Sequence, residues 1–249
     1  MKIVFHPDFY QVYRSDPAAA LGRMESIVAA ISGDYEFIEP RAATEDDIAA
    51  VHTSSHIEHV KGHGLYDVAA LAAGGAIQAA RMGLKEPSFA LIRPPGHHAS
   101  ADTSWGFCYF NNMAIALEKL RREMVIQHAV VLDIDLHFGD GTVNIFRNRD
   151  YVSIFNGSSN HREQYLKAVA KALEEQSPDV IGISAGFDNH REDWGGLLET
   201  EDYTTIGTMV REKCTEVGCG YFAILEGGYN HQVLGHNVLA LLQGMAEKE

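Results

Sequence analysis

The feature that most constrains the fold is a repeated alternation of short β-rich runs with longer helical segments. The expected strands are KIVF at the start, FALI at 89–92, AVVLDID at 129–135, YVSIF at 151–155, VIGIS at 180–184 and FAILE at 222–226. Helical spacing of apolar residues covers 67–82, 112–122 and 162–175. This alternation predicts an α/β fold whose mostly parallel sheet carries helices on both faces.

The chain shows no internal boundary. Its 249 residues contain no repeat and no low-complexity linker, and the prolines mark turns beside the expected elements. A chain of this length can bury a sizeable core within one large α/β domain. We therefore expect a single catalytic domain over residues 1–249.

Charge narrows the range of partners. Asp and Glu number 34 against 20 Lys and Arg, which gives a formal net charge of −14. Such a chain repels phosphate backbones and attracts cations, so we expect no direct nucleic-acid partner and a substrate that is cationic or small.

The cysteines and the apolar runs indicate a cellular location. The three cysteines, Cys108, Cys214 and Cys219, form no CxxC pair, and their odd number argues against a disulfide framework. The start, MKIVFHPDFY, lacks the apolar stretch of a signal peptide, and no run of about 18 apolar residues predicts a membrane span. These features favour a cytoplasmic protein with no membrane partner.

Polar clusters follow four of the expected strands. RPPGHHA follows FALI, LHFGDGT follows AVVLDID, AGFDNH follows VIGIS, and GGYN follows FAILE. In parallel sheets the chemistry lies at the carboxyl ends of the strands. The four clusters are therefore expected to converge on one pocket, although they lie far apart in the sequence.

The second cluster contains candidate metal ligands. If the strand continues through VLDIDLH, residues two apart share one face, and Asp133, Asp135 and His137 point the same way. Carboxylates beside a buried strand need a partner, and a divalent cation is a favourable one. Asp135, His137 and Asp188 supply three ligands and leave a position open, which is typical of a catalytic site. Taken one at a time, each Asp is also typical of a loop or helix cap.

The mixed oxygen and nitrogen ligands suit Zn²⁺, and ligand type alone also allows Fe²⁺ or Co²⁺. The adjacent His97 and His98 follow two prolines and a glycine, and could divide general-base and general-acid roles. Asp133 and Asp140 are carboxylates that could set their tautomers. Tyr229 follows two glycines, whose freedom could aim its hydroxyl at a developing oxyanion.

Taken together, RPPGHHA, GFCYFNN, DIDLHFGDGT, SAGFDNH and LEGGYN resemble the zinc-dependent histone deacetylase and acetylpolyamine amidohydrolase family. The five blocks occur in the family's order between Arg93 and Asn230, and a weaker likeness reaches back to VHTSSHIEHV at 51–60. The resemblance implies an arginase-like deacetylase fold, a sheet with helices on both sides. This agrees with the strand pattern.

The resemblance also implies roles for matching residues. The implied zinc ligands are Asp135, His137 and Asp188. The implied catalytic residues are the tandem pair His97 and His98 with their partners Asp133 and Asp140, and the oxyanion donor Tyr229. Gly106 and Phe107 are implied to line the narrow tunnel for the acylated side chain. Family members also bind a monovalent cation near the residue that matches Asp133, which allows a structural K⁺.

The chain departs from the family pattern mainly around the pocket. Phe138 replaces a frequent second histidine and, one residue from His137, should point away from the metal. The loops NGSSNH and KGHGLYD are short, and the second has no clear counterpart of the aspartate that grips a substrate backbone. These losses predict a more open pocket and make a peptide substrate doubtful. Trp194 either refills part of the space or packs as a buried aromatic.

Four histidines recur at helical spacing: His52, His56, His59 and His63. They could form a second metal site, but an ordinary helix face explains them as well, and no role is assigned.

The leading hypothesis is a metal-dependent amidohydrolase that removes an acetyl or other acyl group from acetyl-lysine, an acetylpolyamine or a related small molecule. One alternative is a two-metal ureohydrolase, which Gly139 and His190 disfavour because they stand where further aspartates would be needed. The other is a noncatalytic binder of acylated amines. The sequence does not indicate the oligomeric state.

Overall fold

A seven-stranded sheet forms the centre of the computed structural model, which describes residues 1–246. The strands are β1 (Lys2–Val4), β2 (Glu36–Ile38), β3 (Ser88–Ala90), β4 (Ala129–Asp133), β5 (Val152–Asn156), β6 (Val180–Ala185) and β7 (Gly220–Leu225). They lie in the order β2-β1-β3-β7-β6-β4-β5, and every paired neighbour runs parallel. The predicted parallel α/β sheet is confirmed.

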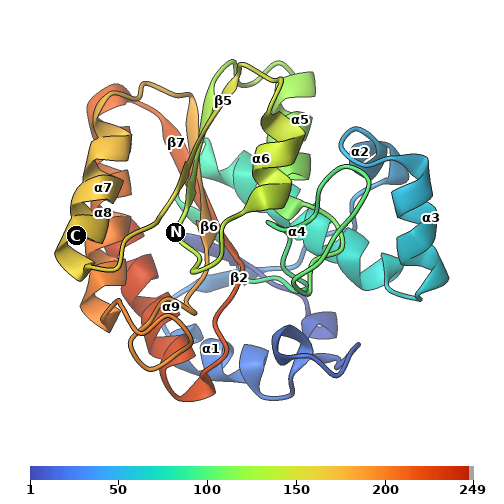
Figure 1. Cartoon of the computed structure of the whole chain (residues 1–249), viewed down its shortest axis with the longest axis horizontal. Helices are drawn as coiled ribbons and strands as arrows, with labels where there is room; N and C mark the ends of the chain where they lie inside the picture. The colour runs from blue at the N-terminus through green and yellow to red at the C-terminus, as the bar shows by residue number, and fades with distance from the viewer. Residues whose placement is uncertain (247–249) are drawn as a thin grey trace.

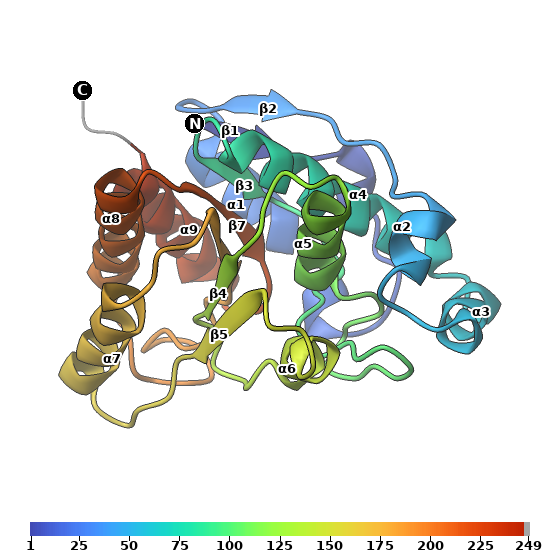
Figure 2. The ribbon, with the colours of Figure 1, turned by 90° about the horizontal axis from the view of Figure 1, so that it is seen from above.

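Helices cover both faces of this sheet. They are α1 (Arg23–Ile31), α2 (Glu45–Ala49), α3 (Ser54–Gly62), α4 (Tyr66–Gly83), α5 (Asn112–Arg122), α6 (Asp140–Phe146), α7 (Arg162–Glu174), α8 (Thr200–Val217) and α9 (His231–Met245). Seen from above, α7, α8 and α9 lie on one side of the strands, and α4 and α5 lie on the other (Figure 2). The short helices α2 and α3 lie at the periphery, outside α4 (Figure 1).

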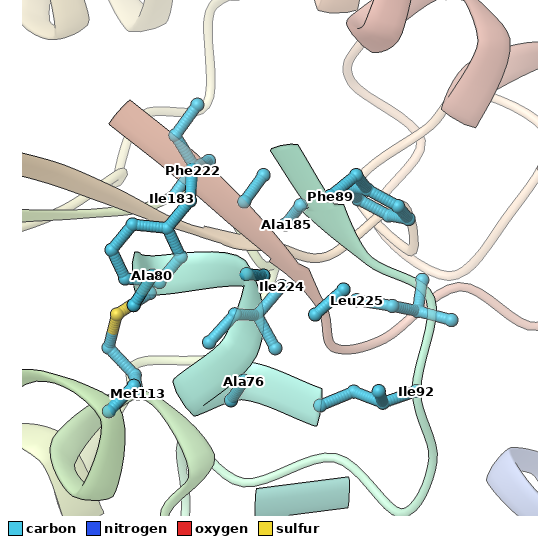
Figure 3. Close-up of a cluster of buried hydrophobic side chains, with 14 of the residues drawn as sticks. Ala76, Ala80, Phe89, Ile92, Met113, Ile183, Ala185, Phe222, Ile224 and Leu225 are labelled. Atoms are coloured by element: carbon cyan, nitrogen blue, oxygen red, sulfur yellow. The ribbon is translucent and has the colours of Figure 1, made fainter. Parts of the chain in front are cut away.

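The core lies between the central strands and the alanine-rich helix α4. Figure 3 shows Ala76 and Ala80 of α4 beside Phe222 and Ile224 of β7, with Met113 of α5 closing the cluster. All five side chains are buried. Small residues let the helix lie close to the strands, and dense packing of this kind makes each core side chain costly to truncate, by about 3–5 kcal/mol for a phenylalanine.

Four adjacent strands carry the polar clusters of the sequence. The central order β3-β7-β6-β4 places the ends of these strands side by side along one edge. Since all four are parallel, their carboxyl ends meet there. The predicted convergence of the four loops is therefore a consequence of the strand order.

Two details of the structure differ from the predicted elements. Strand β4 ends at Asp133 and does not continue to 135, because Asp133 and Asp135 use their side chains to bend the chain. Oδ1 of Asp133 accepts the backbone N–H of Asp135 at 3.1 Å, and Oδ1 of Asp135 accepts that of His137 at 2.9 Å. Such local side-chain bonds compete with the ladder. The edge strand β2 was not predicted, because its three residues carry little apolar pattern.

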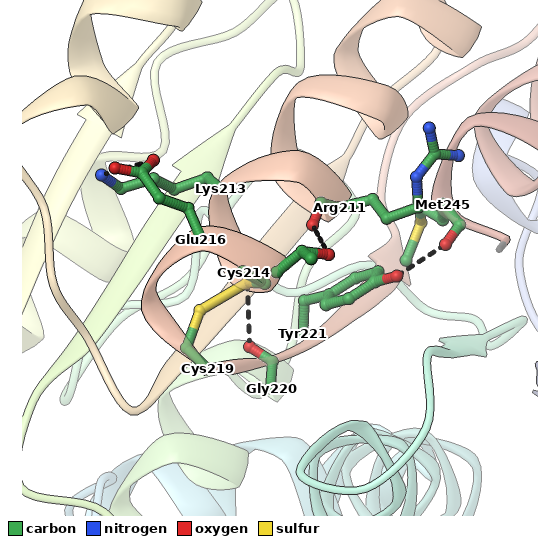
Figure 4. The surroundings of a disulfide bond; sticks show 9 residues. Arg211, Lys213, Cys214, Glu216, Cys219, Gly220, Tyr221 and Met245 are labelled. Atoms are coloured by element: carbon green, nitrogen blue, oxygen red, sulfur yellow. Dashed lines mark hydrogen bonds and ion pairs between the residues drawn. A yellow bond between two sulfur atoms is a disulfide. The ribbon is translucent and has the colours of Figure 1, made fainter.

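One disulfide, Cys214–Cys219, joins the end of α8 to the start of β7 (Figure 4). The odd cysteine count argued against disulfides, and for this pair that argument was wrong. Helix α8 stops at Val217 and Gly218 adopts φ 75°, so the chain reverses and the two Cα atoms lie 4.6 Å apart. Cys108 is free and buried.

Within the described residues, no helix combines the length and the apolar character required to cross a bilayer.

Candidate active site

Three side chains from two neighbouring strand ends form a cluster of potential metal ligands. Asp135 and His137 follow β4, Asp188 follows β6, and one ligand atom from each lies within 4.8 Å of the others. Among residues 1–246, this is the one group of three such residues close enough to share an ion. The two carboxylates are buried, whereas the side chain of His137 is about one-third exposed. The cluster therefore opens to the outside on its histidine side.

The backbone holds both carboxylates in place. Oδ2 of Asp135 accepts the N–H of Gly227 at 2.8 Å, and Oδ1 of Asp188 accepts the N–H of Leu136 at 3.0 Å. A Cβ at position 227 would lie 2.6 Å from Oδ2 of Asp135, so this close approach requires glycine. Loops after three different strands thus fix the two acidic ligands.

The electrostatics of the cluster are those of a cation site. Burial and the charge of Asp135 raise the pKa of Asp188 to about 6. The adjacent carboxylates of Asp135 and Asp188 raise the pKa of His137 to about 10, against burial. Nδ1 of His137 lies 3.2 Å from Oδ1 of Asp135 and 2.9 Å from Oδ2 of Asp188. Positive charge is therefore favoured at the point where the three side chains meet.

One atom of the cluster lacks a proper partner. Oδ2 of Asp188 is buried, and its neighbour Nδ1 of His137, 2.9 Å away, is not aligned for a hydrogen bond, so none of the described residues makes one to it. A buried carboxylate oxygen without a hydrogen bond is costly unless a cation satisfies it. Two oxygen donors, a ring nitrogen and an open side match the donor set of a catalytic divalent metal, so these residues fit such an ion.

The tandem histidines lie beside this cluster, each on its own carboxylate. Nδ1 of His97 is 3.1 Å from Oδ2 of Asp133, and Nδ1 of His98 is 2.7 Å from Oδ1 of Asp140. The two imidazole rings are 4.0 Å apart. Nε2 of His97 faces Asp135 at 3.8 Å, whereas Nε2 of His98 has no hydrogen-bond partner within residues 1–246.

The two imidazoles lie in different electrostatic environments, which shift their pKa values in opposite directions. Burial alone would lower the pKa of His97, but the charges of Asp135 and Asp133 outweigh it and raise this pKa well above its usual value. Burial and the charge of His97 lower the pKa of His98 to about 4. The pair therefore combines one charged imidazole with one neutral imidazole, an arrangement typical of acid–base sites.

Tyr229 lies on the loop that also contacts the ligand Asp135. Its backbone N–H and that of Asn230 both donate to Oδ2 of Asp193, at 2.7 and 2.8 Å. Burial and the charge of Asp135 raise the pKa of the phenol above its usual value. The hydroxyl therefore stays protonated and can donate a hydrogen bond.

His98, His137 and Tyr229 border one cavity of about 250 Å³. It is lined by His98, Trp105, Gly106, Phe107, His137, Trp194 and Tyr229. The rings of Phe107 and Tyr229 meet edge to face at 6.0 Å, and the indole of Trp194 stacks on Tyr229 at 4.1 Å. Trp194 is 53% exposed, so it forms a wall of the cavity and is not the buried packing residue that was the other expectation.

The remaining predicted positions lie outside this cavity. Phe138 is 60% exposed and is not among the lining residues. His52 and His56 are buried, whereas His59 and His63 border a separate cavity of about 250 Å³ that residues 104–109 also line. The four histidines do not form a metal-binding group within the described residues.

The sequence reasoning missed three residues that support the site. Arg23 donates from Nε to the carbonyl of Gly228 at 2.8 Å, and Oε2 of Glu226 accepts the backbone N–H of Gly96 at 2.7 Å. The indole of Trp105 stacks on His98 at 3.8 Å. Glu226 could have been noticed, since a charged residue directly after an apolar strand is unusual. Nothing in the sequence around Arg23 points to a loop 205 residues away.

Comparisons with known proteins point to one family. The family description "Histone deacetylase domain" matches residues 62–165 and 156–245. A "probable deacetylase" of Methanothermobacter thermautotrophicus is 35% identical over an alignment of 306 positions, covering 99% of this chain and 91% of the relative. Because this alignment is longer than the chain, the relative carries inserted residues. A "histone deacetylase-like amidohydrolase" of Pseudomonas aeruginosa is 26% identical, covering 92% of this chain and 78% of the relative.

Two further similarities concern function and fold. An "acetylpolyamine amidohydrolase 1" of Pseudomonas aeruginosa is 30% identical and covers 63% of this chain and 55% of that protein. The crystal structure of the HDA15 HD domain superposes with a TM-score of 0.87 at 23% identity, covering 98% of this chain and 88% of that one. This structural likeness supports the predicted fold.

Proposed function

The chain belongs to the histone deacetylase family, and from that premise we propose that it is a metal-dependent amidohydrolase that removes an acetyl or other short acyl group from an amine. The observation that carries the proposal is the meeting of the Asp135, His137 and Asp188 cluster with the tandem histidines and Tyr229 around one cavity. We also propose that residues 1–249 act as a single catalytic domain, which the single sheet supports. A cytoplasmic location stays a prediction.

The proposed metal ligands are Asp135, His137 and Asp188, and the proposed ion is Zn²⁺, with Fe²⁺ or Co²⁺ as the other candidates. Such an ion supplies Lewis acidity, which polarises the acyl carbonyl and makes a water nucleophilic near neutral pH. A K⁺ beside Asp133 is a further, structural proposal.

His98 is the proposed proton carrier. It lines the cavity and its Nε2 has no hydrogen-bond partner among residues 1–246, so it can take a proton from the attacking water and then give it to the leaving amine. Asp140 holds Nδ1 of His98 and thereby keeps Nε2 directed at the cavity. His97 is the other proposed acid–base residue. It lies between Asp133 and Asp135 and does not line the cavity, so it would act beside His98 and not in contact with the substrate.

Tyr229 is the proposed donor to the oxyanion. Its ring borders the cavity together with His98 and His137. A phenol that stays protonated donates a hydrogen bond that strengthens as the carbonyl oxygen becomes negative. Gly106 and Phe107 are the proposed substrate-binding residues, because they line the same cavity.

The proposed substrates are small acylated amines, with acetylpolyamines and free acetyl-lysine ahead of peptides. Only residues 157–161 separate β5 from α7, so the loop on this side is short. The net charge of −14 favours a cationic amine. The name of the acetylpolyamine amidohydrolase relative agrees with this choice.

Two other functions have less support. A two-metal ureohydrolase needs more carboxylates than the single three-residue group found in residues 1–246. A noncatalytic binder does not require a tandem histidine pair held on two carboxylates. No observation favours either function.

The test is a turnover assay of the chain loaded with Zn²⁺, Fe²⁺ or Co²⁺. The substrates are acetylputrescine, free acetyl-lysine, an acetyl-lysine peptide and a neutral acetylated alkylamine. We expect metal-dependent release of acetate, fastest on a small cationic amine. Tyr229→Phe is the matched control, and it should keep its metal while kcat falls by about 10²–10³-fold. Absence of turnover on every substrate with the metal fully loaded would overturn the proposal.

A further inference from the structure

Trp105 is an exposed tryptophan whose position on the surface needs an explanation. It lies in the loop between β3 and α5, and 54% of its surface is exposed. Its indole covers the imidazole of His98, with ring centroids 3.8 Å apart and planes 30° apart. Single exposed apolar residues are common on protein surfaces, but a large aromatic side chain held over a site residue suggests a role in that site.

The indole N–H of Trp105 is bound to the same carboxylate that holds His98. Nε1 lies 3.2 Å from Oδ1 and 3.0 Å from Oδ2 of Asp140, while Oδ1 also accepts Nδ1 of His98 at 2.7 Å. The three side chains therefore close a ring of contacts, in which stacking and hydrogen bonding connect the same residues. The side chain of Asp140 is 36% exposed, so water would compete for its oxygens if the indole were absent.

The other sides of His98 are also occupied. The ring centroid of His97 lies 4.0 Å from that of His98. A Cβ added at Gly106 would overlap Cδ2 of His98, so the backbone touches this edge of the ring. Only Nε2 remains without a hydrogen-bond partner among residues 1–246, and His98 borders the 250 Å³ cavity.

We propose that Trp105 is a positioning residue for His98: it shields the Asp140 carboxylate and fixes the imidazole so that Nε2 faces the substrate. The inference rests on the proposed function, because it assumes that His98 carries the proton. A partner of this kind typically changes activity by 10–100-fold without touching the reacting atoms. The effect belongs to kcat, since the orientation of a proton carrier matters in the transition state.

Trp194 provides the matched comparison. It is similarly exposed, at 53%, and lines the same cavity. Its indole stacks on Tyr229 instead of on His98, and among the described residues its indole Nε1–H has no hydrogen-bond partner. If both tryptophans only formed walls for the substrate, Trp105→Phe and Trp194→Phe would act alike and mainly on KM.

The first experiment uses the metal-free protein and does not depend on turnover. NMR of ¹⁵N-histidine-labelled chain follows the Nδ1 proton of His98, assigned by its disappearance in His98→Gln. We expect exchange of this proton with water to accelerate by about 10-fold in Trp105→Phe and further in Trp105→Leu, with no change in Trp194→Phe. Equal exchange rates in wild type and both Trp105 variants would overturn the proposal.

The second experiment measures kcat and KM of the metal-loaded enzyme on acetylputrescine, with metal content checked in each variant. Trp105→Phe keeps a stacked ring without the N–H donor, and its kcat should fall by about 10-fold; Trp105→Leu lacks both and should lose about 100-fold. KM should change by less than about twofold. If the wild type is active and the Trp105 variants change KM alone, Trp105 only lines the cavity and the positioning role is overturned. An inactive wild type contradicts the proposed function, while the exchange measurement still decides on Trp105.

Discussion

Nε of Arg23 donates a hydrogen bond of 2.8 Å to the backbone carbonyl of Gly228, the residue before Tyr229. A second nitrogen of the same guanidinium, Nη2, donates to the carbonyl of Glu226 at 2.6 Å. Arg23 is fully buried, and its guanidinium lies 5.6 Å from the centre of the Tyr229 ring. The first turn of α1 thus fixes the loop that presents the phenol.

We expect Arg23→Lys to weaken this loop, because a single ammonium group does not match the forked geometry of the two carbonyl contacts. The free energy of unfolding should fall by about 3 kcal/mol, and kcat should fall by about 10-fold while the metal content stays the same. Urea unfolding, metal analysis and kinetics check this. A variant with wild-type kcat would show that Tyr229 is positioned without Arg23.

Asp188→Asn should have opposite effects on stability with and without metal. In the metal-free chain two buried carboxylates meet at one nitrogen, and removing one charge relieves a desolvation and repulsion cost of about 1–3 kcal/mol. In the metal-loaded chain the same change removes a ligand and should weaken metal affinity by more than about 100-fold. Thermal unfolding with and without a chelator should show the crossing. A variant destabilised equally in both states would contradict the metal assignment.

His52 should make the fold sensitive to acid. Nε2 of His52 accepts the backbone N–H of Asn111 at 2.9 Å, and burial together with the neighbouring His56 lowers its pKa to about 3. Between pH 6.5 and pH 3, His52 is protonated in the unfolded chain but stays neutral in the folded chain. The free energy of unfolding therefore falls as the pH falls. The loss should reach about 2 kcal/mol by pH 5.

His52→Gln tests this, because a glutamine oxygen can still accept the N–H of Asn111 and does not titrate. Urea unfolding of both metal-free proteins at pH 7.5 and pH 5 should show that the variant loses about 2 kcal/mol less than the wild type over this range. Identical losses in the two proteins would mean that the histidine is not held neutral in the folded state.

Trp194 should limit the size of the acyl group or amine that enters. Its indole covers Tyr229 and lies 6.0 Å from the ring of His137, so it narrows the cavity above the proposed ligand. Trp194→Leu should raise kcat/KM for butyryl relative to acetyl substrates by about 10-fold, a typical effect of pocket volume. Competition between the two substrates measures the ratio. An unchanged ratio would place the specificity elsewhere, for example at Phe107.

The sequence by itself determined the elements and the identity of the polar clusters. Period-two and helical patterns are local properties, so the parallel sheet, the helix at 112–122 and the residues at the strand ends could be read directly. The family motifs added the candidate roles of Asp135, His137 and Asp188. Local pattern does not indicate where a strand stops when side chains compete for its backbone, which is why β4 was predicted too long.

Only the tertiary structure decided which distant residues meet. The strand order β3-β7-β6-β4 brings four loops to one edge, and no local pattern specifies that order. The contacts of Arg23 with Gly228 and of Trp105 with Asp140 span 205 and 35 positions. Such pairs are set by the packing of whole elements, because a side chain contacts what the fold places beside it. The sequence therefore identified the candidate catalytic residues, whereas the tertiary structure determined how they are oriented toward one another.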